Sequence, residues 1–300
     1  MHTRQPAFHA AQLKRRAGER IAPAVAGFLR AGYAPSARGL WYCPLIVPLS
    51  SIRWGFLIFC LLSAACERRA EPHKVRIAAA ADLHFALEEV SREFRAAHPD
   101  VDLETAYGSS GNFYAQIRNQ APFDVFLSAD MEYPRKLVQD GIGARDSLFV
   151  YAVGRIVVWV PASSPLDPAT ALRAASVRHV AIANPGHAPY GRAAEAALRS
   201  LGVYESVVGK LVLGENVAQT LEFVQSGAAD VGIVALSLAL APPVRGQGRY
   251  WEVPDAAYTR IEQGGVILKD SEAARELRAF LLGDGARRIL KEYGFSLPEK

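Results

Sequence analysis

Residues 75–90 join a buried strand to a helix through a run of small residues, and this unit constrains the fold most strongly. Residues 75–79 are mostly apolar or small, as in a strand covered on both faces. From Leu83 the apolar residues recur at helical spacing. Asp82 stands where that helix should begin and belongs to the residue class preferred at an N-cap. Because a helix start presents unpaired N–H groups and the positive end of its dipole, we expect it to suit an anion.

The same succession of strand, loop and helix recurs along the chain. Further strands are predicted at 101–106, 123–128, 155–160, 180–183, 211–213, 230–235 and 266–268. Further helices are predicted at 113–118, 133–139, 192–201, 218–226 and 272–293, the last broken at 283–285. This alternation predicts an α/β protein of two lobes, each a helix-covered, mainly parallel sheet, with a ligand cleft between the lobes. We assign 1–73 to a leader, signal peptide and tether, 74–157 plus 243–300 to lobe 1, and 158–242 to lobe 2.

The leader carries an export signal. Residues 54–65 form an apolar run that is too short to span a bilayer and suits a signal-peptide core. The run ends in Cys66, and residues 62–66 resemble a bacterial lipobox, with Ser63 in place of the usual large aliphatic residue. The alternatives are ordinary cleavage near Ala65, or a short buried helix in a cytoplasmic protein. We expect a periplasmic protein, soluble or lipid-anchored at Cys66, and hypothesise that translation starts near residue 47–52.

Charge and cysteine usage exclude several classes of function. Residues 1–70 hold ten Lys or Arg and two Asp or Glu, so the remainder has 24 basic and 28 acidic residues. The high pI therefore belongs to the leader and indicates no nucleic-acid surface. Cys43, Cys60 and Cys66 all lie in the leader, which leaves no disulfide framework or cysteine metal site in the rest. The histidines form no ligand pattern, and no cofactor is expected.

Four loops stand at predicted strand ends and precede predicted helices: 81–82, 108–112, 187–191 and 215–217. In α/β sheets such loops meet at the ligand cleft. Each offers backbone N–H groups, and Ser109, Ser110 and Tyr190 add hydroxyl donors. None of the four loops contains Lys or Arg. Neutral donors that converge in this way fit a site for a doubly charged oxyanion.

The ordered set of short motifs at 79–81, 108–110, 116–117, 121–130, 216–217 and 232–234 resembles the periplasmic molybdate-binding proteins of bacterial ABC importers. The resemblance runs from about residue 74 to 295. It implies the type II periplasmic-binding-protein fold and a monomeric, non-catalytic receptor. That receptor would capture molybdate, and tungstate, for a permease in the inner membrane. The only metal implied is molybdenum inside the bound oxyanion.

The resemblance also implies the ligand contacts by position. Ser110 would donate its hydroxyl and N–H, and Val217 a backbone N–H. Ala81 and Asp82 would donate from the first helix start. Tyr190 falls where the family uses a backbone N–H or, in some members, a tyrosine hydroxyl.

Two positions depart from the family pattern. Asp82 stands where Ser or Asn is frequent, and a carboxylate facing a dianion costs about 1–4 kcal/mol per charge pair. It would be tolerated if it capped the helix, or if the ligand carried a proton, as phosphate or arsenate does. Ala235 stands where some members place a ligand tyrosine, and we hypothesise that the Tyr190 hydroxyl replaces it.

Other functions remain open at this point. The same fold would suit sulfate, phosphate or an organic anion. A serine hydrolase using Ser110 is the alternative of another class, although Gly-Ser-Ser-Gly differs from G-x-S-x-G and no His–Asp set is evident. A ligand-sensing domain of a regulator is disfavoured by the export signal.

Overall fold

The computed structural model describes residues 73–298, and this part of the chain contains two five-stranded sheets. The first has the order β2-β1-β3-β10-β4, with β1 His73–Ala80, β2 Val101–Gly108, β3 Val125–Ser128, β4 Phe149–Gly154 and β10 Ile261–Ile267. The second has the order β7-β6-β8-β5-β9, with β5 Ile156–Pro161, β6 Val180–Ala183, β7 Leu211–Gly214, β8 Val231–Ala235 and β9 Gly248–Glu252. In each sheet one strand, β10 or β5, runs opposite to the other four. We call the first sheet with its helices lobe 1 and the second sheet with its helices lobe 2.

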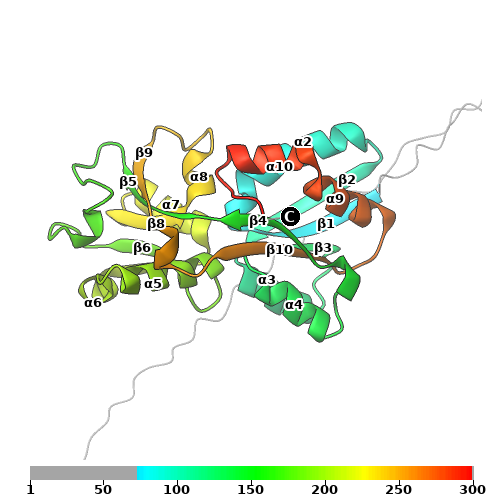
Figure 1. Cartoon of the computed structure of the whole chain (residues 1–300), viewed down its shortest axis with the longest axis horizontal. Coiled ribbons are helices and arrows are strands. Elements are labelled where there is room, and N and C mark those ends of the chain that lie inside the picture. Colours follow the sequence, from blue (N-terminus) through cyan, green and yellow to red (C-terminus); the bar gives the residue numbers. More distant parts are fainter. Residues whose placement is uncertain (1–72, 299–300) are drawn as a thin grey trace, which may run out of the picture. The chain divides into compact units, whose positions relative to one another are not determined.

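Helices cover these sheets. The α-helices are α2 His84–Ala97, α3 Ser110–Arg118, α4 Glu132–Gln139, α5 Pro189–Ser200, α6 Tyr204–Val207, α7 Val217–Gln225, α8 Leu236–Leu240, α9 Glu272–Leu282 and α10 Asp284–Glu292. The short 3₁₀ turns are η1 Ala81–Leu83, η2 Arg145–Ser147, η3 Ala171–Arg173, η4 Val208–Lys210 and η5 Asp255–Ala257. In lobe 1, α2, α9 and α10 lie on one side of the sheet and α3 and α4 on the other (Figure 1). None of the helices described is long and apolar enough to cross a membrane.

The strand–loop–helix units that the sequence predicts are confirmed. β1 pairs in parallel with β2 and β3, and β6 with β7 and β8. Ile77 and its small neighbours in β1 are fully buried because helices cover both faces of the sheet. Leu87, Val90 and Phe94 bury the apolar face of α2. The predicted α/β class therefore holds, and the carboxyl ends of these parallel strands mark where a ligand site is expected.

Two strands were not predicted, and both belong to the segments that connect the lobes. β4 ends at Gly154 and β5 begins at Ile156, so the chain passes from the first sheet to the second at Arg155. β9 returns the chain, and its residues 248–252 pair with β5 although they lie in the range 243–300 expected for lobe 1. Gly246 precedes this edge strand and Gly248 is its first residue. The return to the first sheet therefore follows Glu252.

The predictions for the leader concern residues outside those that the structure describes. These are the apolar run 54–65, the lipobox at Cys66, the alternative cleavage near Ala65 and the start site near 47–52. They remain predictions.

Candidate ligand-binding site

Four segments from the two lobes meet around one small cavity of about 10 Å³. It is lined by the turn after β1, the start of α3 after β2, the start of α5 after β6, and the start of α7 after β7. All five candidate residues line it: Ala81, Asp82, Ser110, Tyr190 and Val217. Its lining within the described chain contains no Lys or Arg. The sequence thus predicted which residues come together, and the cavity is far smaller than the ~300–1,000 Å³ usual for drug-sized ligands.

The two adjacent serines make different contacts. Ser110 begins α3, so its backbone N–H has no partner within the helix. Its Oγ accepts a hydrogen bond from the Ala129 amide at 3.0 Å, which leaves the hydroxyl hydrogen free to donate. Ser109 Oγ instead donates to the His187 carbonyl at 2.7 Å and lies 2.8 Å from Nδ1 of the same histidine. Ser110 is therefore the donor for a ligand, and Ser109 joins lobe 1 to lobe 2.

Asp82 does not cap the first helix, so that interpretation is wrong. Asp82 lies inside η1. The N-cap residues are Ala80 for η1 and Leu83 for α2, and no side-chain hydrogen bond caps either helix. The carboxyl group is buried, with 1% of the residue exposed. Its Oδ2 accepts from the Tyr190 hydroxyl at 3.0 Å and from Gln263 Nε2. Burial raises the pKa of Asp82 to about 6, although the two hydrogen bonds oppose that shift.

The hydroxyl of Tyr190 makes a different contact from the ligand contact that was expected. It is the second residue of α5, after Pro189, so its N–H has no partner within the helix. Its hydroxyl hydrogen is donated to Asp82 rather than left for a ligand. Burial, and then the nearby Asp82, raise the pKa of Tyr190 well above its usual value, so the phenol remains a neutral donor. The hypothesis that this hydroxyl contacts the ligand directly therefore requires Asp82 to release it.

Val217 is the first residue of α7, and a side-chain cap positions it. Asn216 Oδ1 accepts from the amides of Ala218 and Gln219, both at 3.0 Å. The cap satisfies the next two amides and leaves the Val217 N–H at the cavity. The loop 215–217 therefore stands between a strand and a helix start, as the sequence predicted, and the Asn216 cap is a feature that the structure adds.

Contacts between the lobes close the rim of the cavity. The His187 carbonyl accepts from Ser109 Oγ and also from the Gly111 amide at 2.8 Å. A Cβ on Gly111 would lie 2.5 Å from that carbonyl oxygen, so only glycine fits. Asn112 Nδ2 and Glu215 Oε1 form a further hydrogen bond across the rim. The second glycine of Gly-Ser-Ser-Gly therefore serves the contact between lobes rather than the ligand.

Gln263 and Ser237 are functional candidates that the sequence did not reveal. Gln263 is fully buried in β10 and donates to both Asp82 and Tyr190. Ser237 Oγ donates to the Asp82 carbonyl at 2.8 Å. The only sequence signal was a polar residue within an otherwise buried strand, because Gln263 and Asp82 are 181 positions apart.

Asp124 and Asp130, which flank strand β3, both have structural partners. Asp124 Oδ2 accepts from the Arg76 amide at 2.7 Å, and Asp130 Oδ1 accepts from the Tyr133 amide at 3.1 Å. Asp130 also pairs with Arg192. Within residues 73–298 no group of three or more His, Cys, Asp or Glu side chains could hold a metal ion.

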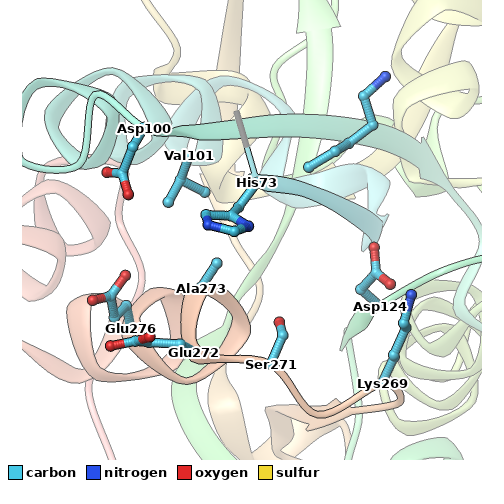
Figure 2. A pocket seen from close by; sticks show the side chains of 10 residues that line it. His73, Asp100, Val101, Asp124, Lys269, Ser271, Glu272, Ala273 and Glu276 are labelled. Atoms are coloured by element: carbon cyan, nitrogen blue, oxygen red, sulfur yellow. The ribbon is translucent and has the colours of Figure 1, made fainter. Parts of the chain in front are cut away.

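A larger open pocket of about 440 Å³ lies at the amino end of β1 (Figure 2). Its lining mixes both signs of charge, with Lys74 and Lys269 beside Asp100, Glu272 and Glu276. The α9 start at this pocket is already capped, because Ser271 Oγ accepts from the Ala274 amide at 3.2 Å. It lies away from the carboxyl ends of the parallel strands, where ligands bind in such sheets.

The chain is similar to extracellular solute-binding proteins over nearly all of the described residues. The family model of bacterial extracellular solute-binding proteins matches residues 75–296. The molybdate-binding protein ModA of Azotobacter vinelandii is 38% identical over 239 residues, which cover 78% of this chain and 93% of that protein. ModA of Rhodobacter capsulatus is 42% identical over 193 residues, 63% of this chain and 75% of that protein. The solved Azotobacter vinelandii periplasmic molybdate-binding protein matches with a TM-score of 0.71 at 32% identity, covering 75% of this chain and 100% of that one.

Proposed function

This chain belongs to the bacterial extracellular solute-binding proteins, and we propose that it is the molybdate-binding component of an ABC importer. Its two-lobed α/β fold is that of the type II periplasmic binding proteins. Relatives at 38% and 42% identity carry the name molybdate-binding protein, which supports molybdate as the ligand. The protein would bind the oxyanion between its lobes and deliver it to a permease in the inner membrane.

The observation that carries this proposal is the convergence of uncharged donors on one small cavity. The amides of Ala81, Tyr190 and Val217 stand at the starts of three helical segments, and Ser110 adds an amide and a hydroxyl. Fixed dipoles of this kind bind an anion without basic side chains. Because molybdenum in molybdate is surrounded by its own oxygen atoms, these residues would contact oxygen and not the metal.

The donor set supports binding rather than catalysis. In a serine hydrolase the Ser110 hydroxyl would need a histidine as its base. Within the described residues, Ser110 Oγ has the Ala129 amide as its hydrogen-bond partner, whereas His187 contacts Ser109. The named relatives are binding proteins, which agrees with this geometry.

The proposed location of the protein is the periplasm. We also propose that a lipid on Cys66 anchors the protein to the membrane. Mass spectrometry of the protein from bacterial membranes tests the anchor, because a lipidated Cys66 would be the new N-terminus. A mature N-terminus next to Ala65 without lipid would show the ordinary cleavage instead.

A thermal-melt panel with molybdate, tungstate, sulfate, phosphate and arsenate tests the function. Ligand at 1,000 times its dissociation constant adds about 4 kcal/mol to the free energy of unfolding. For a domain of this size the melting temperature would rise by roughly 8–16 °C. We expect this rise with molybdate and tungstate. A rise with sulfate or phosphate alone would transfer the proposal to that anion, and no rise with any of the five would refute it.

A further inference from the structure

The two oxygens of the Asp82 carboxyl group have different surroundings. Oδ2 accepts hydrogen bonds from the Tyr190 hydroxyl and from Gln263 Nε2. Oδ1 is buried, and no atom of the described chain hydrogen-bonds to it. Asp82 also lines the small cavity. An unpaired oxygen on a buried carboxyl group is costly, so a partner from outside the chain is expected at Oδ1.

The orientation of Gln263 determines which oxygen can carry a proton. The Tyr151 hydroxyl lies 3.0 Å from Gln263 Oε1 and 3.0 Å from the Ser128 carbonyl oxygen, and its single hydrogen serves one of these two acceptors. In the orientation of the structure, Oε1 of Gln263 points to Tyr151 and the amide nitrogen points to Asp82. Its Nε2 therefore donates to Asp82 Oδ2 and, at 3.1 Å, to the Tyr190 hydroxyl oxygen. Since Oδ2 already receives two donors, a proton on Asp82 belongs on Oδ1.

Among residues 73–298, the groups that shift the pKa of Asp82 include no positively charged side chain. The titratable groups that face it are the phenols of Tyr151 from β4 and Tyr190 from α5. Gln263 from β10 and Ser237 from α8 are neutral partners. His84, the first residue of α2, has an exposed side chain. Burial raises the pKa of Asp82 to about 6, so the neutral form is accessible near neutral pH.

We propose that Asp82 binds the oxyanion as a neutral carboxylic acid, with the Oδ1 hydroxyl donating to a ligand oxygen, so that binding takes up one proton. This inference rests on the proposed function and adds that one proton is bound together with the anion. The carboxyl group would then add a hydrogen bond where its ionised form would repel the dianion. Affinity for a dianion should fall as the pH rises above the pKa of the free protein, by up to about tenfold per pH unit.

Isothermal titration calorimetry with molybdate at pH 6, 7 and 8 tests the proposal. Each pH is measured in two buffers of different ionisation enthalpy, because the difference in heat counts the protons exchanged. We expect uptake that approaches one proton per molybdate at pH 8, and a dissociation constant up to ~50-fold larger at pH 8 than at pH 6, because half of the free protein is already protonated at Asp82 at pH 6. Molybdate binding with no proton uptake and a flat pH profile would overturn this inference and leave the proposed function intact.

Two variants make the assignment specific. Asp82→Asn replaces the hydroxyl with an amide that donates at every pH, so uptake should vanish and binding at pH 8 should be tighter than in the wild type. Asp130→Asn is the matched control, because burial also raises the pKa of Asp130 but its partners are Arg192 and the Tyr133 amide. Uptake that disappears in Asp130→Asn and persists in Asp82→Asn would refute the assignment. If the folded wild-type protein, with a normal melting curve, does not bind molybdate at all, the proposed function is refuted.

Discussion

Replacing Ser110 with alanine should weaken molybdate binding far more than the same change at Ser109, although the two hydroxyls are neighbours. Ser110 Oγ accepts from the Ala129 amide and keeps its hydrogen for the ligand. A hydrogen bond to a charged partner contributes about 1.5–3 kcal/mol. Its loss should raise the dissociation constant roughly 10- to 160-fold.

Ser109 is the matched control because its hydroxyl donates to the His187 carbonyl across the rim. A hydrogen bond between neutral groups contributes about 0.5–1.5 kcal/mol, or roughly 2- to 12-fold in the dissociation constant. The low end applies, since the Gly111 amide still donates to the same carbonyl. Ser109→Ala should therefore cost only a few-fold in affinity.

Isothermal titration calorimetry of the two variants against the wild type measures both effects. Ser110→Ala also leaves the buried Ala129 amide without its acceptor, which costs about 1–3 kcal/mol of stability. The titrations must therefore be run well below the melting temperature of each variant. An unchanged affinity in Ser110→Ala, or an equal loss in Ser109→Ala, would refute the division of roles between the serines.

Two further predictions concern charge. In the folded state the pKa of Asp82 is raised from 3.8 to about 6, so ionisation of Asp82 destabilises the fold. The free energy of unfolding therefore falls as the pH rises from about 4 to about 6. Above pH 6 it stays about 3 kcal/mol lower than at acidic pH. Asp82→Asn should therefore raise the melting temperature at pH 8 and not at pH 4; the same gain at both pH values would contradict the assigned cause. Arg192 pairs with Asp130 while partly exposed, so Arg192→Gln should lower stability by about 1 kcal/mol or less and leave molybdate affinity within a few-fold. A large loss of affinity in a calorimetric titration would mean that a basic side chain contributes to binding.

The elements that the sequence predicted best are those with local signals. Strand β6 was predicted from the short apolar run 180–183, and α7 from the helical segment 218–226 that follows the loop 215–217. Strand β9 was missed because it is a half-exposed edge strand after two glycines, a composition equally typical of a connector. β4 was missed because it continues almost directly into β5, so its own end is not marked by a turn.

The candidate site also has one part that could be predicted from the sequence and one part that could not. Backbone donors at helix starts could be predicted, since a helix start is a local feature. The interaction of Asp82 with Gln263 could not, because it depends on how β10 returns to the first sheet after lobe 2 has been completed. The position of Asp82 at the cavity was expected, but its hydrogen-bond partners decided its role. Partners distant in the chain have no signature in a single sequence.

Two of the five candidate residues, Ala81 and Val217, contribute only a main-chain amide, which a substitution of the side chain leaves in place. Random mutation in a population can therefore alter these residues while the anion keeps its donors. Evolutionary change in selectivity would instead be concentrated at Asp82, Ser110 and Tyr190, whose side chains carry the remaining chemistry. A library randomised at these three codons is the shortest route from this scaffold to a receptor for a different tetrahedral nutrient or pollutant.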